Sequence, residues 1–209
     1  MTRACNAPAN RRQVGAFLSY HPVMNKFLLV MLGLGFGALA RGAAPVLDNE
    51  HVTVWDSTAA LAPAMHDFVE VSLSRKGTAS FGHRGDRPGR RGSRTIMIEL
   101  KDLPVGPLAN ESGYPLAFPR KHVKKLLENA QVVVWDYTWK AREPTPMHFH
   151  DKDAVAVFEA AGSVKSTTPD GKSVISESRF GDVKFAARNR IHSEVLVGGK
   201  AHAVVVELK

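Results

Sequence analysis

The sequence predicts an all-β protein, and two observations support this fold class. From about residue 131 onward, short runs such as "VVVWDYTW", "DAVAVFEA" and "AHAVVVEL" alternate or are rich in β-branched residues. Turn signals separate such runs at intervals of roughly 8–12 residues, which is typical of a sandwich or a barrel. The second observation is an internal repeat. The chain of 209 residues is long enough for one large domain or two small ones.

The repeat is visible at three places along the chain. Val-Trp-Asp occurs at 54–56 and at 134–136, and Met-His occurs at 65–66 and at 147–148, which gives offsets of 80 and 82 residues. Each copy ends in Glu-Leu-Lys, the second at the final residue Lys209. We therefore predict two β units. A shortened, degenerate first unit spans 49–103, and a complete second unit spans 131–209.

A linker at 104–130 is predicted to join the two units. Its first part is rich in Pro and Gly, which favours an extended conformation. Its second part places Val123, Leu126 and Leu127 at helical spacing, after Pro119 and before Asn129. This pattern predicts one short linker helix. Apolar residues along the linker also predict that the two units pack together and unfold as one body.

Residues 1–44 are typical of a secretory signal peptide. A lysine precedes an apolar run from Phe27 to Ala40, which ends in Ala38-Leu39-Ala40. Met24 is an alternative start, because a complete signal follows it. We expect a periplasmic or secreted protein without stable membrane association after cleavage. The run is short and glycine-rich for a membrane span, so an uncleaved anchor is the weaker alternative.

Charge and cysteine content limit the partners. The formal net charge is +8, and removal of Arg3, Arg11, Arg12 and Lys26 would leave 24 basic and 20 acidic residues, or +4. This charge is too small to predict a nucleic-acid partner, and the basic stretch 75–94 is typical of a solvated loop. The single cysteine, Cys5, lies in the predicted signal, so the mature chain offers no thiol ligand or disulfide.

Three histidines are candidate metal ligands. His148 and His150 stand two residues apart, so a strand directs both imidazoles to one face. His192 follows turn signals at Gly181-Asp182 and Arg188-Asn189. If its strand pairs with that of His148, three imidazoles meet. Buried imidazoles need a metal or hydrogen bonds. The predicted cofactor is one divalent metal, without a choice among Fe, Mn, Zn and Ni.

Asp153 is a doubtful fourth ligand. It lies three residues after His150, and strand parity directs its side chain to the face opposite that histidine. A kink or bulge after "HFH" would be needed to bring it back. We therefore expect an accessory role at most.

Two segments resemble the motifs of the cupin superfamily, a double-stranded β-helix or jelly roll. "HFHDKDAVAVFEAAG" is similar to the first motif, with Gly162 at its end, and "GDVKFAARNRIHSEVL" is similar to the second. Ala187 replaces a motif proline, and the expected glutamate falls near Ala154 or Val155, which cannot ligate. The resemblance covers about residues 50–209. It implies a small bacterial two-cupin (bicupin) protein that binds metal through three histidines alone.

The remaining candidates are assigned structural roles. The first unit has His66 but Phe68 where a second histidine would stand, so we interpret it as scaffold. The alternative is a small anion site formed by His83, Arg84 and Arg87. Asp151 and Glu159 are expected to be solvated surface charges, and the three tryptophans are expected to be core residues.

Three functions stay open at this point, because fold does not fix function. The first is a metalloenzyme acting on a small molecule, with no reaction named. The second is a non-catalytic module that binds a metal or a small ligand. The third is a structural β-barrel protein without metal. The expected partners are a small-molecule ligand and a second copy of the chain, as a homodimer.

Overall fold

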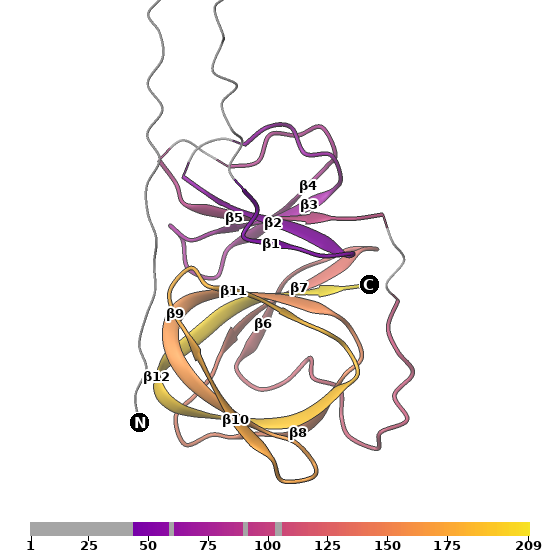
Figure 1. Ribbon diagram of the computed structural model, residues 1–209, viewed down its shortest axis with the longest axis vertical. Helices are drawn as coiled ribbons and strands as arrows, with labels where there is room; N and C mark the ends of the chain where they lie inside the picture. Colours follow the sequence, from indigo (N-terminus) through magenta and orange to yellow (C-terminus); the bar gives the residue numbers. More distant parts are fainter. Residues whose placement is uncertain (1–43, 59–60, 90–91, 103–105) are drawn as a thin grey trace, which may run out of the picture. The chain divides into compact units, whose positions relative to one another are not determined.

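A computed structural model describes residues 44–58, 61–89, 92–102 and 106–209 (Figure 1). The predicted signal peptide, apart from its last residue, lies outside the described residues. These described residues all belong to one compact unit. Every regular element in the described ranges is a β-strand, so the predicted all-β class is confirmed. None of the described residues forms a helix that could cross a membrane.

The N-terminal part of this unit is a five-stranded antiparallel sheet. Its spatial order is β1-β2-β5-β3-β4. The strands are β1 (Leu47–Asp48), β2 (Val52–Ser57), β3 (Phe68–Ser72), β4 (Ala79–Gly82) and β5 (Thr95–Leu100).

The C-terminal part is a seven-stranded sheet that curls into a barrel. The strands are β6 (Val123–Glu128), β7 (Val132–Thr138), β8 (Thr145–His150), β9 (Ala154–Thr167), β10 (Ser173–Ser178), β11 (Val183–Ala186) and β12 (Arg190–Leu208). The order is β10-β9-β12-β7-β6, with β8 also paired to β12 and β11 also paired to β9. The long strands β9 and β12 wrap around the barrel (Figure 1). The predicted double-stranded β-helix is confirmed.

Glycines allow β9 and β12 to bend together. The register between the strands shifts between Leu196 and Gly198 and again between Gly199 and His202. Gly199 has a φ of +71°, and a Cβ on Gly162 would lie 2.6 Å from the backbone nitrogen of Ala201. A side chain at either position would strain this close approach of two backbones. Gly162, the glycine of the first sequence motif, is therefore needed for the curvature of the barrel.

The predicted linker helix is wrong. The structure has strand β6 at Val123–Glu128, which pairs antiparallel with β7. The register shifts between Lys125 and Leu127, so a bulge interrupts the alternation of side chains. Val123, Leu126 and Leu127 are all partly buried as a result. A bulged strand therefore produced the apolar spacing that resembled one face of a helix.

The internal repeat has a counterpart in the strand pairing. Val54 is opposite Ile98 in the β2–β5 pair, and the matching Val134 is opposite Val206 in the β7–β12 pair. The turn before the first strand of each pair, β2 or β7, also contains the same hydrogen bond. The side-chain oxygen of Asn49 accepts the backbone N–H of Val52, and that of Asn129 accepts the N–H of Val132, both at 2.9 Å. Whether the first sheet is a degenerate cupin unit stays a prediction.

Two clusters of buried apolar side chains make up most of the core. The first joins the outer face of the barrel to the five-stranded sheet, and it consists of Val52, Val54, Val69, Val71, Leu73, Ile96, Ile98, Leu100, Val132, Val134, Val155, Val157, Val204, Val206 and Leu208. The second fills part of the barrel interior and includes Trp135, Tyr137, Trp139 and Phe158. Trp135 and Trp139 are core residues, as predicted.

Asp151 and Glu159 are buried, so their predicted exposure is wrong. Glu159 lies on the same face of β9 as Val157, which belongs to the core shared with the five-stranded sheet. Its Oε2 accepts the backbone N–H of Gly77 at 2.7 Å and lies 3.0 Å from Nδ1 of His202. His202 also contacts Asp136 through Nε2. This polar cluster ties the β3–β4 turn to the barrel.

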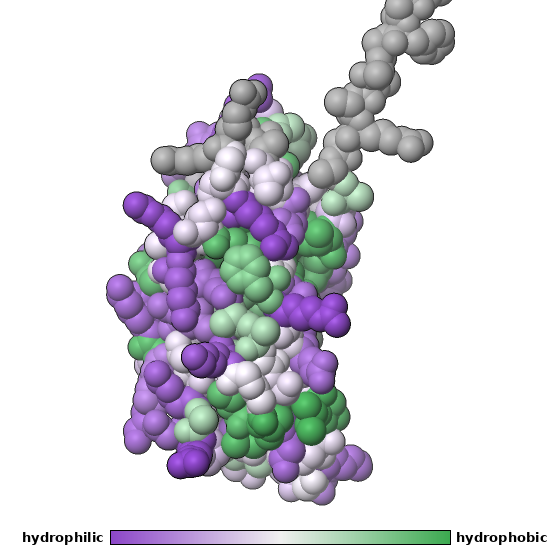
Figure 2. Space-filling view, turned by 90° about the vertical axis from the view of Figure 1, so that its left-hand side faces the viewer, coloured by the Kyte–Doolittle hydropathy of each residue, from purple (hydrophilic) through white to green (hydrophobic). Residues whose placement is uncertain are grey.

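The outer surface of the barrel retains exposed apolar residues, among them Val174, Ile175 and Val197. Figure 2 shows one face of the molecule, on which apolar side chains gather toward the lower end of the view. The predicted homodimer stays a prediction.

Because one core is shared by both sheets, we expect a single unfolding transition. Glu159→Ala should lower the unfolding free energy by about 2–4 kcal/mol, since it leaves buried partners unpaired. The exposed Glu177 provides a matched control, and Glu177→Ala should change stability by less than about 0.5 kcal/mol. Calorimetry with chemical denaturation measures both effects. Two transitions, each assignable to one sheet, would contradict the shared core.

Candidate metal centre

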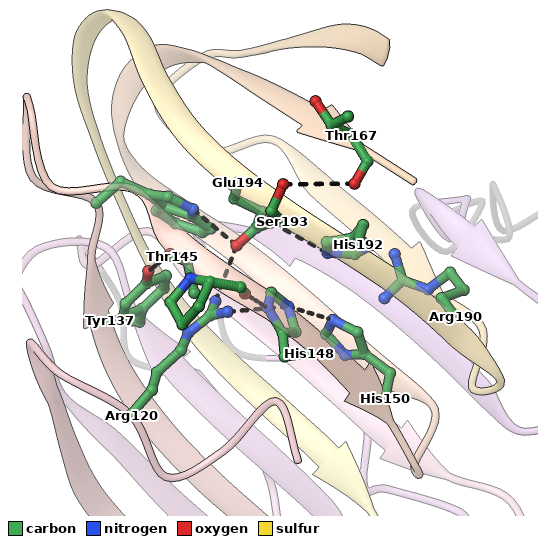
Figure 3. A network of polar contacts seen from close by, with 12 residues as sticks. Arg120, Tyr137, Thr145, His148, His150, Thr167, Arg190, His192, Ser193 and Glu194 are labelled. Carbon is green, nitrogen blue, oxygen red and sulfur yellow. Dashed lines mark hydrogen bonds and ion pairs between the residues drawn. The ribbon is translucent and has the colours of Figure 1, made fainter. Parts of the chain in front are cut away.

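Pairing of β8 with the start of β12 brings the three predicted histidines together. His148 lies opposite His192 in register, and Arg190 lies opposite His150. Alternation along each strand directs His148, His150 and His192 into the barrel, where all three are buried. Figure 3 shows the three rings side by side. Their candidate ligand nitrogens all lie within 4.8 Å of one another.

The distances and tautomers fit a shared metal ion. Nε2 of His148 lies 3.2 Å from Nε2 of His150. Two nitrogens bound to one zinc ion at about 2.0–2.1 Å lie about 2.8–3.4 Å apart for octahedral to tetrahedral angles. Nδ1 of His148 is 2.8 Å from the carbonyl oxygen of Pro146 and donates to it, which leaves the Nε2 lone pair for a ligand. Nε2 of His192 is buried without a hydrogen-bond partner.

The environment keeps two of the imidazoles neutral. Burial, and then the charge of Arg120, lower the pKa of His148 to about 4. Burial, and then the charge of Arg190, lower the pKa of His150 to about 2. Neutral imidazole is the form that binds a metal ion. These two side chains are therefore in the ligand form at neutral pH.

Glu194 belongs to the site but was not predicted. It lies on the same face of β12 as His192, and its Oε1 is 3.5 Å from Nε2 of that histidine. Its Oε2 accepts hydrogen bonds from Arg120 and from Nε1 of Trp139, both at 3.1 Å. Burial would raise the pKa of Glu194, but the His192 contact and the Arg120 charge lower it below its usual range. The alternation of Arg190, His192 and Glu194 along one strand was the signal available in the sequence.

Arg120 is the second functional residue that the sequence did not reveal. One of its terminal nitrogens donates to Nε2 of His148 at 3.1 Å, and the guanidinium lies 4.0 Å from the centre of the Tyr137 ring. A metal at the histidines would take the lone pair that Arg120 uses here. Arg120 lies in the predicted linker, and no local pattern indicates that this segment reaches the barrel.

The structure does not bring Asp153 into the histidine cluster. Its Oδ1 accepts the backbone N–H of Arg188 at 2.7 Å, and its Oδ2 lies 3.7 Å from Nε2 of His51. His66 also lies apart, with Nδ1 3.2 Å from a carboxylate oxygen of Asp102.

The alternative anion site in the first unit holds carboxylates of its own. The backbone N–H of His83 donates to Asp86 at 2.9 Å, and that of Arg84 donates to Asp67 at 3.0 Å. These carboxylates occupy hydrogen-bond donors that an anion would use.

A cavity of about 270 Å³ adjoins the histidines. Its polar lining comprises Arg120, His150, Ser166, Ser176, Ser178, Lys184, Arg190, His192 and Glu194, and its apolar lining comprises Phe118, Trp139, Ala154, Ala156, Phe158, Val164, Phe185, Ala186 and Val205. A small organic molecule therefore has a largely apolar space beside the candidate metal site.

Several solved structures are similar to this chain. A cupin domain from Bordetella pertussis Tohama I is 24% identical, with a TM-score of 0.39, over 46% of this chain and 96% of that one. A cupin 2 conserved barrel domain protein from Leptotrichia buccalis is 12% identical, with a TM-score of 0.41, over 79% and 87%. An RmlC-like cupin family protein from Methanocaldococcus jannaschii is 16% identical, with a TM-score of 0.35, over 48% and 92%.

No protein-family model matches the sequence, and no curated protein is significantly similar to it. The likenesses to solved structures concern the fold alone. The closed pairing of β8, β9 and β12, with three histidines directed inward as the two motifs predict, gives this chain the fold of the cupin superfamily.

Proposed function

We propose that the barrel binds one divalent metal ion through His148, His150 and His192 and uses it on a small molecule in the adjoining cavity. The main support is the arrangement of three buried imidazoles whose candidate ligand nitrogens lie within 4.8 Å of one another. Nε2 of His192 is buried without a well-formed hydrogen bond, and its nearest acceptor is Oε1 of Glu194 at 3.5 Å, so a bound ion would satisfy this nitrogen. The low pKa values of His148 and His150 remove competition from protons at neutral pH.

A metal held by three protein ligands keeps open positions, where it would polarise a bound oxygen or activate water. The protein's own groups would orient that centre. The Pro146 carbonyl holds the ring of His148 through Nδ1, and Glu194 lies against His192. Trp139 and Arg120 hold Glu194 in turn. The apolar wall of the cavity would limit water around the site.

One observation favours a metal-free binding protein as the second candidate. Arg120 donates to Nε2 of His148 at 3.1 Å, which satisfies that imidazole without a metal. In this reading the histidines line a pocket for an organic ligand. Metal analysis separates the two functions.

Alanine variants test the ligand set. His148→Ala, His150→Ala and His192→Ala should each lose most of the bound metal, because three ligands hold the ion together. Asp153→Ala should keep much of it, and His66→Ala nearly all, since neither side chain reaches the cluster. Metal content per chain, measured by elemental analysis after dialysis against Fe, Mn, Ni, Cu or Zn, provides the result. A wild-type protein that takes up none of these ions would refute the metal site.

The ionisation of the ligands is a separate prediction. A lowered pKa means that the neutral form persists to lower pH, so His148 and His150 should stay neutral from pH 7.5 down to about 5. NMR titration of the Cε1–H signals in metal-free protein, assigned with the single alanine variants, measures this. Midpoints near the ordinary value of about 6.5 would show that burial does not suppress the charge as proposed.

We also propose export, on the pattern of residues 1–44 alone. If a signal peptidase cleaves after the Ala38-Leu39-Ala40 segment, the secreted protein should begin between Arg41 and Val46. N-terminal sequencing of protein recovered from the periplasm or medium gives the answer. A chain that begins at Met1 and stays in the cytoplasm would contradict export.

A further inference from the structure

Arg190 lies beside the candidate metal ligands but is not one of the groups proposed to bind or orient the metal. It precedes His192 by two residues on β12, so both side chains face the barrel interior, and it lies opposite His150 in register. Its side chain lines the cavity together with both of these histidines. Figure 3 shows the guanidinium directed toward them.

The guanidinium of Arg190 is only partly satisfied. Its Nε donates to the carbonyl oxygen of Ala187 at 2.6 Å. Among the residues that the structure describes, no carboxylate lies within ion-pair distance of Arg190, although Glu194 and Asp153 act on it through longer-range charge interactions, and its terminal nitrogens have no hydrogen-bond acceptor. A guanidinium has five N–H donors in a planar arrangement, so the four on the terminal nitrogens of this partly buried, cavity-lining residue are available to a ligand or to water.

The other two cations of the cavity are already engaged. Arg120 forms an ion pair with Glu194 at 3.1 Å and lies over the Tyr137 ring. Lys184 donates to the hydroxyl oxygens of Ser176 and Ser178 at 2.8 Å each, and to a backbone carbonyl. Among the described residues of the lining, Glu194 is the one acidic side chain beside Arg120, Lys184 and Arg190, so these side chains carry an excess of positive charge.

The lining therefore defines the chemistry of a ligand. A negative group is favoured at Arg190, and an apolar body is favoured along walls such as Phe158, Ala156 and Val205. The volume of about 270 Å³ lies just below the roughly 300–1,000 Å³ of typical ligand sites, which favours a small ligand. A planar carboxylate matches the paired donors of a guanidinium.

We propose that Arg190 binds the carboxylate of a small, otherwise apolar organic acid, with the carboxylate beside the histidines and the apolar body along the wall formed by Phe158, Ala156 and Val205. The inference rests on the proposed function in one respect, since the metal gives this ligand something to react with. The carboxylate contact itself requires only Arg190 and the cavity.

Binding of matched pairs of small molecules tests this assignment. Propionate, benzoate and phenylacetate would each be titrated calorimetrically against their uncharged amides, with metal-loaded wild-type protein. At least one acid should bind about tenfold more tightly than its amide, because a hydrogen bond to a charged group is involved. If no acid is preferred over its amide, or if inorganic phosphate binds more tightly than every acid, the assignment is overturned.

Two variants distinguish the contribution of Arg190 to acid binding from that of the metal. Arg190→Gln should weaken binding of the preferred acid about tenfold or more, while its metal content and its affinity for the amide stay at wild-type values. Arg179→Gln removes the same charge from an exposed position outside the cavity lining and should leave acid binding unchanged. Unchanged acid binding in Arg190→Gln would overturn the assignment.

The two proposals fail in different ways. If wild-type protein holds no metal, the proposed metal function fails, and the same acid and amide pairs are compared in the metal-free protein. A preference for the acid that Arg190→Gln abolishes would then still support the carboxylate site. Metal at the histidines without any such preference would support the metal site and overturn the role of Arg190.

Discussion

The antiparallel pairing of β8 with the first residues of β12 is the constraint on which the candidate site depends. It places His192 opposite His148 and Arg190 opposite His150. Because side chains alternate along a strand, this register directs all four side chains into the barrel. If one strand slipped by one residue, the site side chains on that strand would point out of the barrel. The metal proposal and the carboxylate proposal therefore both follow from a single register.

Two sets of contacts stabilise this register of β8 and β12. First, β12 is 19 residues long in all, and beyond its pairing with β8 it bends at Gly198 and Gly199 and then pairs with β7. Second, the outer face of the barrel packs on the five-stranded sheet through a shared core of buried valines, isoleucines and leucines. The buried cluster of Glu159, His202 and Asp136 adds polar contacts to this junction. The first sheet thus supports the barrel wall behind the site.

The sequence was sufficient for the fold class and for the three histidines, because both depend on local alternation and on turns. It was insufficient where a bulge broke the alternation, as in β6, whose apolar spacing resembled a helix. It also could not reveal Arg120, which reaches His148 across 28 positions of the chain. Glu159 was wrongly predicted to be exposed because burial against a second sheet leaves no mark in its own strand. Glu194 could have been predicted, because it lies two residues after His192 on the same strand. Its hydrogen bond from Trp139 could not have been predicted.

The central claim is that His148, His150 and His192 bind the same ion. X-ray absorption spectroscopy on the zinc-loaded protein tests it most directly, because it counts the nitrogen neighbours of the metal and gives their distances. The account predicts three imidazole nitrogens at about 2.0–2.1 Å, with oxygen in the remaining positions. It further predicts that His192→Ala leaves at most two imidazoles on any ion still bound. A wild-type spectrum with fewer than three imidazoles, or one unchanged by His192→Ala, would contradict a shared ion.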